Sequence, residues 1–256
     1  MIIAGDIHAT LHALQTLQTL ATALDTQILQ VGDWGGHWTT PCQLHTHQLL
    51  NTGPTIWTCG GNHENYEALK AFKAKGGFRE IHPSTYFALR PAKLQLRNHR
   101  ICFFGGAEST DAFYRLEGKN WWREETPTDA EFDGLAGMID TFKPDIMITH
   151  EAPISQRPWR APGTNPLSNK PHDYTSKRLQ QILDASTHKP RYWFYGHHHE
   201  LIATKTETTQ FYCCGLHGQG WLLLDDPTDS SREVVIQITN GNHDRVLSLA
   251  KQLARS

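Results

Sequence analysis

Five short segments of the chain bring together carboxylate, imidazole and amide side chains of the kinds that bind metal ions. The segments are Asp6-Ile7-His8, Gly32-Asp33, Gly61-Asn62-His63-Glu64, Thr149-His150-Glu151 and Gly196-His197-His198-His199. Each one closes an apolar run, and none contains a cysteine. Oxygen and nitrogen ligands without thiolates suit a pair of divalent cations, and such pairs support hydrolytic chemistry on phosphate.

The spacing within two of these segments lets two side chains approach one ion. Side chains two residues apart in an extended segment point to the same side, so Asp6 acts with His8 and His197 with His199. A glycine before the second pair allows the backbone to turn sharply beneath the ligands. Taken singly, Asp33 is better explained as a turn or helix-capping residue. Only the complete set argues for a metal site.

All five segments lie where a predicted strand ends. The hydrophobic pattern predicts strands at 1–4, 27–31, 55–59, 145–149 and 192–195, and helices at 10–24, 41–50, 63–74, 128–141 and 175–184. Strands that alternate with helices indicate a largely parallel sheet. In open α/β sheets, functional groups collect at the carboxyl ends of the strands. We therefore expect the five segments to form one site.

The remaining segments predict a second sheet within one domain. Short runs at 85–89, 93–96 and 100–104 indicate an antiparallel meander, and further strands are expected at 211–214, 221–224, 233–238 and 245–249. Two packed sheets with helices outside them fit this layout. No repeat or linker interrupts the chain, so residues 1–256 are expected to form a single domain, with elaborated loops at about 105–127 and 152–175.

Composition limits the class of protein. Lys plus Arg number 24 and Asp plus Glu number 26, so strong nucleic-acid binding is not expected. No apolar run approaches the roughly 18 residues of a membrane span. Five cysteines, an odd number that includes the adjacent Cys213 and Cys214, argue against a disulfide framework. The chain starts with a strand-like run in place of a signal peptide, so we expect a cytoplasmic protein.

A second sequence, Gly241-Asn242-His243-Asp244, nearly repeats Gly61-Asn62-His63-Glu64. It lies between two strand-like runs, and the Asn-Gly pair just before it is a strong hairpin signal. The earlier copy lies between a strand and a helix, as a site at a strand end requires. We interpret the later copy as a turn.

The five segments, in this order, resemble the motif series of the calcineurin-like metallophosphoesterase superfamily. The matching motifs are Asp-x-His, Gly-Asp, Gly-Asn-His-Glu/Asp, His and Gly-His-x-His, and they extend from residue 6 to residue 199. The resemblance implies an α/β fold, a four-layer αββα sandwich of two mixed β-sheets flanked by helices. It also implies a centre of two divalent metal ions, with Mn expected and Fe, Zn, Ni or Co as alternatives.

The resemblance also implies a role for each residue that matches a motif. One metal would be held by Asp6, His8 and His199, the other by Asn62, His150 and His197, with Asp33 bridging the two. Asp33 and His63 would be the catalytic residues. His63 would contact the phosphate and protonate the leaving alkoxide.

The expected function is hydrolysis of phosphate esters by attack of a metal-bridging hydroxide. The substrate would be a nucleotide-like or other small phosphate ester, so the enzyme would be a phosphodiesterase or phosphatase. Protein Ser/Thr phosphatases of the superfamily carry an Asp-Arg pair after the Gly-Asp motif, whereas Gly32-Asp33 is followed here by Trp34-Gly35. A nuclease acting on short nucleic acid and a catalytically silent protein-binding scaffold are the alternatives.

Arginines and tryptophans in the two long loops are candidate substrate contacts. The arginines are Arg115, Arg123, Arg157 and Arg160, which suit a second phosphate; Trp121, Trp122 and Trp159 suit stacking on a base. The ordinary alternative is that the arginines lie on the surface and the tryptophans pack in the core. The sequence indicates no oligomeric state.

Overall fold

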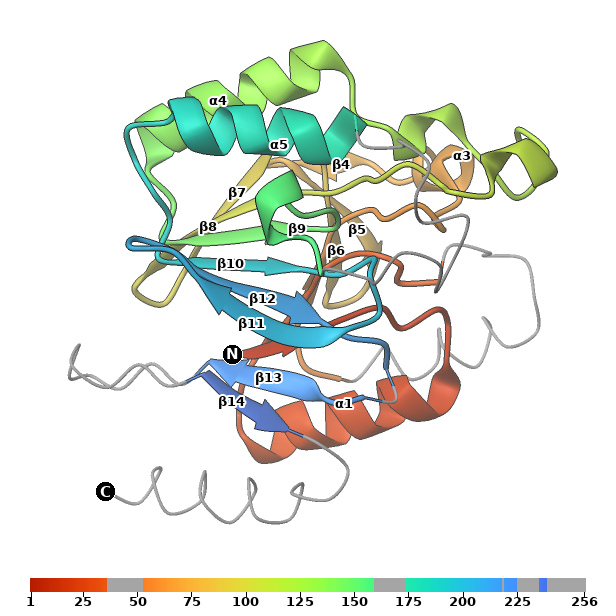
Figure 1. Ribbon diagram of the computed structural model, residues 1–256. Helices are drawn as coiled ribbons and strands as arrows, with labels where there is room; N and C mark the ends of the chain where they lie inside the picture. Colours follow the sequence, from red (N-terminus) through yellow and green to blue (C-terminus); the bar gives the residue numbers. More distant parts are fainter. Residues whose placement is uncertain (36–52, 159–173, 218, 225–234, 239–256) are drawn as a thin grey trace, which may run out of the picture.

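The computed structural model describes residues 1–35, 53–158, 174–217, 219–224 and 235–238. In these residues the chain forms four layers, a helix, two mixed β-sheets and a pair of helices (Figure 1). Helix α1 (Leu11–Ala23) covers the outer face of one sheet, while α4 (Asp129–Phe142) and α5 (Tyr174–Ala185) cover the other. The predicted αββα architecture is confirmed.

The first sheet contains β1 to β6 together with two strands from the C-terminal part of the chain. The strands are β1 (Ile2–Ala4), β2 (Ile28–Gln30), β3 (Ile56–Thr58), β4 (Ala74–Lys75), β5 (Phe78–His82), β6 (Thr85–Ala88), β13 (Trp221–Leu224) and β14 (Val235–Ile238), in the order β14-β13-β1-β2-β3-β6-β5-β4. β1, β2, β3 and β6 are parallel neighbours, and the outer strands on both sides are antiparallel.

The second sheet is built from the middle of the chain. Its strands are β7 (Ala92–Leu96), β8 (His99–Phe104), β9 (Ile146–Thr149), β10 (Tyr192–Tyr195), β11 (Leu201–Lys205) and β12 (Gln210–Cys214), in the order β11-β12-β10-β9-β8-β7. β8, β9, β10 and β12 run parallel, while β7 and β11 are antiparallel edges. Both sheets therefore place the carboxyl ends of their central strands at the same edge of the fold (Figure 1).

Alternating side chains sort the apolar residues into layers. Ile3 and Phe103 belong to the core between the two sheets, whereas Ile2 packs with Leu14 and Leu17 of α1. On the other side, residues of β8 to β10 pack against α4 and α5. Because side chains of a strand alternate between its faces, strands buried on both faces must be apolar throughout, as β1 is.

Helix boundaries follow from local chemistry. α4 begins at a capping box, in which the Thr128 hydroxyl accepts from the Glu131 N–H and the Glu131 carboxylate accepts from the Thr128 N–H. The helix predicted at 63–74 was too long: α3 spans only Tyr66–Leu69, and a β4–β5 hairpin turning at Gly76 and Gly77 follows it. None of the helices in the described residues is both long and apolar enough to span a membrane.

The meander predicted from three successive strands was wrong in its pairing. β6 pairs in parallel with β3 of the first sheet, while β7 and β8 form a hairpin in the second sheet. The chain thus changes sheets between β6 and β7. β5 and β11 were not predicted. The expected helix at 41–50, the strand at 245–249 and the turn at Gly241 lie outside the described residues, and the single-domain organisation stays a prediction.

Phe103 tests the packing between the sheets because its side chain is fully buried there. We expect Phe103→Ala to lower the free energy of unfolding by about 3–5 kcal/mol, since it removes a large apolar side chain and leaves a cavity. Urea unfolding would measure this loss. Ile202→Ala, on the exposed edge strand β11, is the matched control and should change stability by well under half as much.

Candidate metal centre

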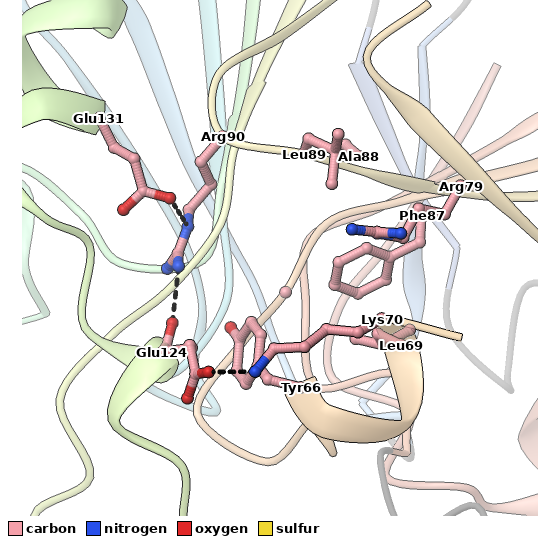
Figure 2. Close-up of a pocket in the computed structure, with 11 residues that line it drawn as sticks. Tyr66, Leu69, Lys70, Arg79, Phe87, Ala88, Leu89, Arg90, Glu124 and Glu131 are labelled. Atoms are coloured by element: carbon pink, nitrogen blue, oxygen red, sulfur yellow. Dashed lines mark hydrogen bonds and ion pairs between the residues drawn. The ribbon is translucent and has the colours of Figure 1, made fainter. Parts of the chain in front are cut away.

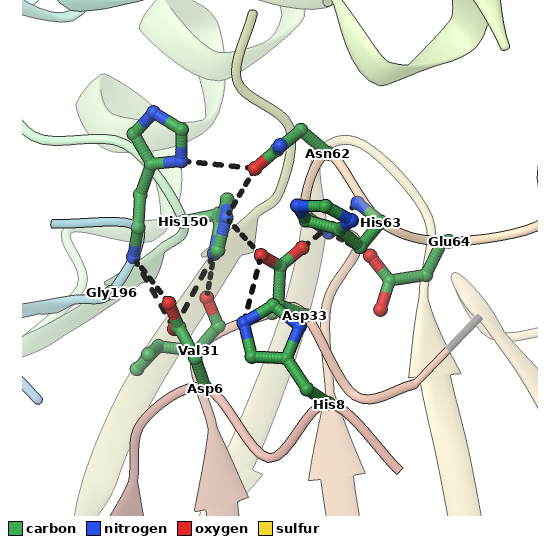
Figure 3. Close-up of polar contacts among 12 residues, drawn as sticks. Asp6, His8, Val31, Asp33, Asn62, His63, Glu64, His150 and Gly196 are labelled. Carbon is green, nitrogen blue, oxygen red and sulfur yellow. Dashed lines mark hydrogen bonds and ion pairs between the residues drawn. The ribbon is translucent and has the colours of Figure 1, made fainter. Parts of the chain in front are cut away.

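The polar segments predicted from the sequence meet at one edge of the fold, as Figure 3 shows. Asp6 follows β1, Asp33 follows β2 and Asn62 follows β3, all in the first sheet. His150 follows β9 and His197 follows β10, both in the second sheet. The cluster therefore forms only when the two sheets pack against each other.

Four of the predicted ligands have left-handed backbone conformations. The φ angle is 47° at His8, 53° at Asp33, 66° at His197 and 54° at His199. Such conformations cost about 1–3 kcal/mol each in a residue with a Cβ atom, so other contacts must hold them. The His8 N–H donates to the Asp33 carbonyl at 2.9 Å, and the His197 N–H donates to Asp6 Oδ2 at 3.0 Å. The turns that aim the ligands are thus fixed by the ligands' own hydrogen bonds.

Two glycines of the motifs leave room for the carboxylates of the cluster. A Cβ atom at Gly61 would overlap the carboxylate of Asp33, and one at Gly196 would overlap that of Asp6. Both glycines belong to segments singled out in the sequence. Their role here is to let backbone lie directly against an acidic side chain.

The first ligand group consists of Asp6, His8, Asp33 and His199. One ligand atom from each of the four residues lies within 4.8 Å of those of the other three, an arrangement that could hold a metal ion. His199 Nε2 lies 3.0 Å from Asp6 Oδ2 and 3.2 Å from His8 Nε2. His8 Nε2 is 3.7 Å from Asp33 Oδ2. These are the residues that the resemblance assigned to one metal, together with the bridging aspartate.

The second ligand group consists of Asn62, His150 and His197. The amide oxygen of Asn62 lies 3.2 Å from His150 Nε2 and 2.9 Å from His197 Nδ1. His150 Nε2 is also 3.5 Å from Asp33 Oδ2, the same oxygen that faces His8. Asp33, which is 1% exposed, therefore stands between the two groups.

His150 shows that this cluster requires a positive charge. Its Nδ1 lies 2.9 Å from the Val31 carbonyl, which only accepts, so Nδ1 carries the proton and donates it there. Nε2 then faces two accepting oxygens, from Asn62 and Asp33, so a proton or a cation is needed between this nitrogen and the oxygens. Burial alone would lower the pKa of His150, but the carboxylates of Asp33, Asp6 and Glu64 together outweigh burial and raise the pKa to about 10. A bound cation would satisfy the same atoms, so the ligand set fits a metal ion.

Two buried acids, Glu151 and Glu64, support the cluster of ligands, and neither was predicted to have a role. Glu151 lies 2.8 Å from His198 Nε2 and 3.8 Å from His197 Nε2, on the side of the His197 ring away from Asn62. A carboxylate behind a ligand histidine fixes the orientation of its ring. Both this acid and Glu64 directly follow a histidine in their motifs, and that position is the signal that could have identified them.

Glu64 joins two of the loops that carry ligands. Its carboxyl oxygens accept from the backbone N–H groups of Trp34, at 2.7 Å, and Gly61. Burial, with a smaller contribution from the charge of Asp33, raises the pKa of Glu64 to about 8. Ser109 supports Asn62 in a comparable way, because the Asn62 amide nitrogen donates to the Ser109 hydroxyl at 3.2 Å and leaves the amide oxygen facing the histidines. No local sequence pattern indicates Ser109.

His63 lies beside the ligand groups and contacts an arginine of the first long loop. Its ring lies edge-on to that of His8, with centroids 5.1 Å apart, and the backbone N–H of His63 donates to Asp33 Oδ1 at 2.9 Å. Arg115 lies with Nη2 3.2 Å from His63 Nε2 and donates from Nη1 to the Asn62 carbonyl at 3.2 Å. Burial lowers the pKa of His63 to about 4, and the Arg115 charge acts in the same direction against Asp33.

The other predicted substrate contacts are more scattered. Arg123, whose side chain is 80% exposed, pairs with Glu117 at 3.5 Å, and Arg157 lies 3.9 Å from Glu151. Trp121 is partly buried, whereas Trp122 is buried in a core cluster with Tyr66 and Phe87. Arg160 and Trp159 lie outside the described residues. Of the seven candidate contacts, Arg115 touches two residues of the predicted site, Asn62 and His63, and the substrate roles stay predictions.

Comparison with known proteins shows the family of this chain. The model of the calcineurin-like phosphoesterase family matches residues 1–201. No curated protein sequence matches the chain. A candidate 5′-nucleotidase from Staphylococcus aureus, solved with α-ketoglutarate, has a similar structure, with a TM-score of 0.55, 13% identity and 98% of this chain covered.

Two further solved structures share the fold. GAP50, described as the anchor in the inner membrane complex of Plasmodium, gives a TM-score of 0.55 at 10% identity, covering 93% of this chain and 77% of that protein. The sulfate thiohydrolase SoxB from Thermus thermophilus gives 0.50 at 9% identity, covering 93% of this chain. The chain spans 57% of the Staphylococcus protein and 46% of SoxB. At these identities the likeness concerns the fold alone.

Asp33→Asn tests the position of this carboxylate between the two ligand groups. We expect the variant to hold markedly less metal than the unaltered protein, because one anionic ligand shared by both groups becomes neutral. Metal analysis of the purified protein measures the content. Asp140→Asn, at an exposed position on α4, is the control and should keep full content. Full metal content in Asp33→Asn would contradict a bridging role.

Proposed function

Because the chain belongs to the calcineurin-like phosphoesterase family, we propose that it hydrolyses phosphate esters at a centre of two divalent metal ions. The observation that carries this proposal is the position of Asp33. One buried carboxylate oxygen faces His8 of the first ligand group and His150 of the second. A carboxylate in this position could serve as a ligand shared by two cations.

The two ligand groups would each hold one ion. The first group offers the carboxylate of Asp6 with two imidazoles, and the second offers the amide of Asn62 with two imidazoles. This mixture of oxygen and nitrogen atoms suits Mn, which we favour, and also Fe, Zn, Ni or Co. When bound, the two ions supply Lewis acidity, which activates water and neutralises phosphate oxygens.

His63 and Arg115 would act on the substrate itself. Arg115 is a permanent cation with several donors, suited to binding phosphate oxygens, and it already lies against the site through His63 and the Asn62 carbonyl. A phosphate that draws the guanidinium onto its oxygens would release His63 Nε2. With the guanidinium charge neutralised by the phosphate, Nε2 would take up a proton from water, and the resulting imidazolium would donate that proton to the leaving alkoxide.

The substrate class we propose is a nucleotide-like or other small phosphate ester. The name of the Staphylococcus aureus neighbour, a candidate 5′-nucleotidase, supports this class. GAP50 is named as an anchor, so the fold also occurs in a protein described by a structural role. The full set of ligand residues and His63 in this chain favours an enzyme over a scaffold.

The location we propose is the cytoplasm. Cys59, Cys102, Cys213 and Cys214 are buried free thiols in the described part of the chain. Burial raises the pKa of the Cys102 thiol to about 12, so the thiol stays protonated and unreactive. Unpaired thiols of this kind suit a reducing compartment.

Hydrolysis of bis-p-nitrophenyl phosphate and p-nitrophenyl phosphate tests the proposed activity. We expect turnover with added Mn²⁺ and loss of turnover with EDTA, since the ligand groups need cations to work. Faster cleavage of the diester would identify a phosphodiesterase, and faster cleavage of the monoester a phosphatase. A purified protein that holds metal but cleaves neither would contradict the proposal and favour a scaffold.

His63→Gln tests the proton transfer. We expect the variant to keep its metals and to lose about 10²–10⁴-fold in kcat, because its amide can still form hydrogen bonds but cannot donate a proton to the leaving group. His188→Gln, far from the cluster and bonded to the Pro144 carbonyl, is the matched control. Loss of metal in His63→Gln would mean that His63 is a ligand and not an acid.

A further inference from the structure

The loop of residues 109–125 is anchored at both ends beside the metal ligands. The Ser109 N–H and hydroxyl donate to the two Glu125 carboxyl oxygens at 2.7 and 2.8 Å, which closes the base of the loop. The Ser109 hydroxyl also contacts both the amide nitrogen and the carbonyl of Asn62, at 3.2 and 3.4 Å. The base of the loop is therefore held against a predicted metal ligand.

A second set of contacts holds the C-terminal end of this loop. Figure 2 shows a pocket beside α3 in which Lys70 and Arg90 both reach Glu124. Lys70 pairs with the Glu124 carboxylate at 2.8 Å, and Arg90 donates to the Glu124 carbonyl at 2.6 Å. Arg90 also pairs with Glu131 of α4 at 3.2 Å. Two cations of this pocket, Lys70 and Arg90, thus hold the C-terminal end of the loop.

The tip of the loop reaches the site through Arg115. Its side chain is 11% exposed and pairs with Asp111 at 2.8 Å, so one acid of the same tip holds the guanidinium in place. The guanidinium touches His63 and the Asn62 carbonyl. The short 3-10 helix η1 (Ala112–Tyr114), which directly precedes this arginine, therefore lies at the rim of the site.

Two aromatic rings on η1 are exposed at this rim. Phe113 is 56% and Tyr114 is 76% exposed, and their ring centroids lie 3.9 Å apart at an interplanar angle of 41°. Leu116, on the other side of Arg115, is 60% exposed. Among the described residues, these three are the large apolar side chains that are more than half exposed. A cluster of this kind at the rim of a site indicates a binding surface.

We propose that Phe113 and Tyr114 form a subsite for an aromatic group, such as a nucleobase, that is part of the phosphate ester. This inference rests on the proposed function, which places the phosphate of the substrate at Arg115. Tyr114 adjoins Arg115 in the chain, so their Cα atoms are about 3.8 Å apart. A ligand whose phosphate meets the Arg115 guanidinium would be bound within one residue of the two rings along the chain, so its remaining part can extend toward them. Aromatic faces stack on every base, which provides affinity without reading sequence.

The structure argues against base stacking by one of the three predicted tryptophans, Trp122, and the roles of the other two stay predictions. Trp122 is 6% exposed and packs with Leu69 and Ile81 in the core, so it has no free face for a ligand. The rings that the structure offers at the rim are phenylalanine and tyrosine on a short helical turn.

Binding of AMP compared with ribose 5-phosphate isolates the contribution of the base. The two ligands share phosphate and ribose, so a difference in affinity comes from adenine. With Mn²⁺ present, we expect the unaltered protein to bind AMP about 10-fold more tightly or better by titration calorimetry. The double variant Phe113→Ala/Tyr114→Ala should bind the two ligands within about twofold of each other. Chromatography of the ligands afterwards checks that they stay intact.

Two single variants serve as matched controls in the same loop. Leu116→Ala removes an exposed apolar side chain without a ring and should keep the preference for AMP. Arg115→Ala should weaken both ligands by similar factors, because it removes a phosphate contact and leaves the rings. Circular dichroism checks that every variant is folded. If Leu116→Ala lost the preference for AMP over ribose 5-phosphate as fully as the double variant, a specific role of the two rings would be overturned.

The outcomes separate this inference from the proposed activity. Equal affinity for the two ligands in the unaltered protein, no binding of AMP, or a preference that survives in the double variant would each overturn the subsite. A preference for AMP without turnover of either nitrophenyl ester would overturn the activity and leave the subsite standing. Self-association that is lost in the double variant, with no preference for AMP, would assign the rings to contact with a second copy of the chain.

Discussion

The structure depends on one electrostatic constraint, the convergence of buried acidic and imidazole side chains around Asp33. A buried carboxylate is tolerated only where cations or donors neutralise it. Here the neighbouring charge of His150 keeps the pKa of Asp33 below its usual range despite burial. His8 faces the same carboxylate from the other side. Several features hold this arrangement: the glycines that leave room for the carboxylates, the left-handed conformations of four ligand residues, and the supporting acids Glu64 and Glu151.

The same constraint explains the architecture of two packed sheets. The acidic and amide ligands Asp6, Asp33 and Asn62 come from the first sheet, and the imidazoles of His150 and His197 come from the second. Neither sheet alone could assemble the site. The apolar core between them, which includes Ile3 and Phe103 among its residues, fixes the separation at which the ligands meet. Packing and chemistry are therefore linked through the register of the two sheets.

Local sequence patterns predicted the parts of this arrangement that are local. A metal-type ligand at the end of an apolar strand, as at Asp6 or His150, can be recognised from a few neighbouring residues. The layered fold was predicted from the order of strands and helices along the chain. Pairing between distant strands was not predicted: β6 joins the first sheet beside β3 although the next two strands join the second. The contact of Ser109 with Asn62 joins residues 47 positions apart, and no pattern near either residue indicates it.

The most direct test of the account is a Mn²⁺ titration of the metal-free protein followed by electron paramagnetic resonance. Since Asp33 lies between both ligand groups, two ions bound there would be close enough to interact magnetically. We expect two Mn²⁺ ions per chain and a spin-coupled spectrum when both are bound. A single isolated Mn²⁺ spectrum at saturation, or two ions without coupling, would contradict a shared centre around Asp33.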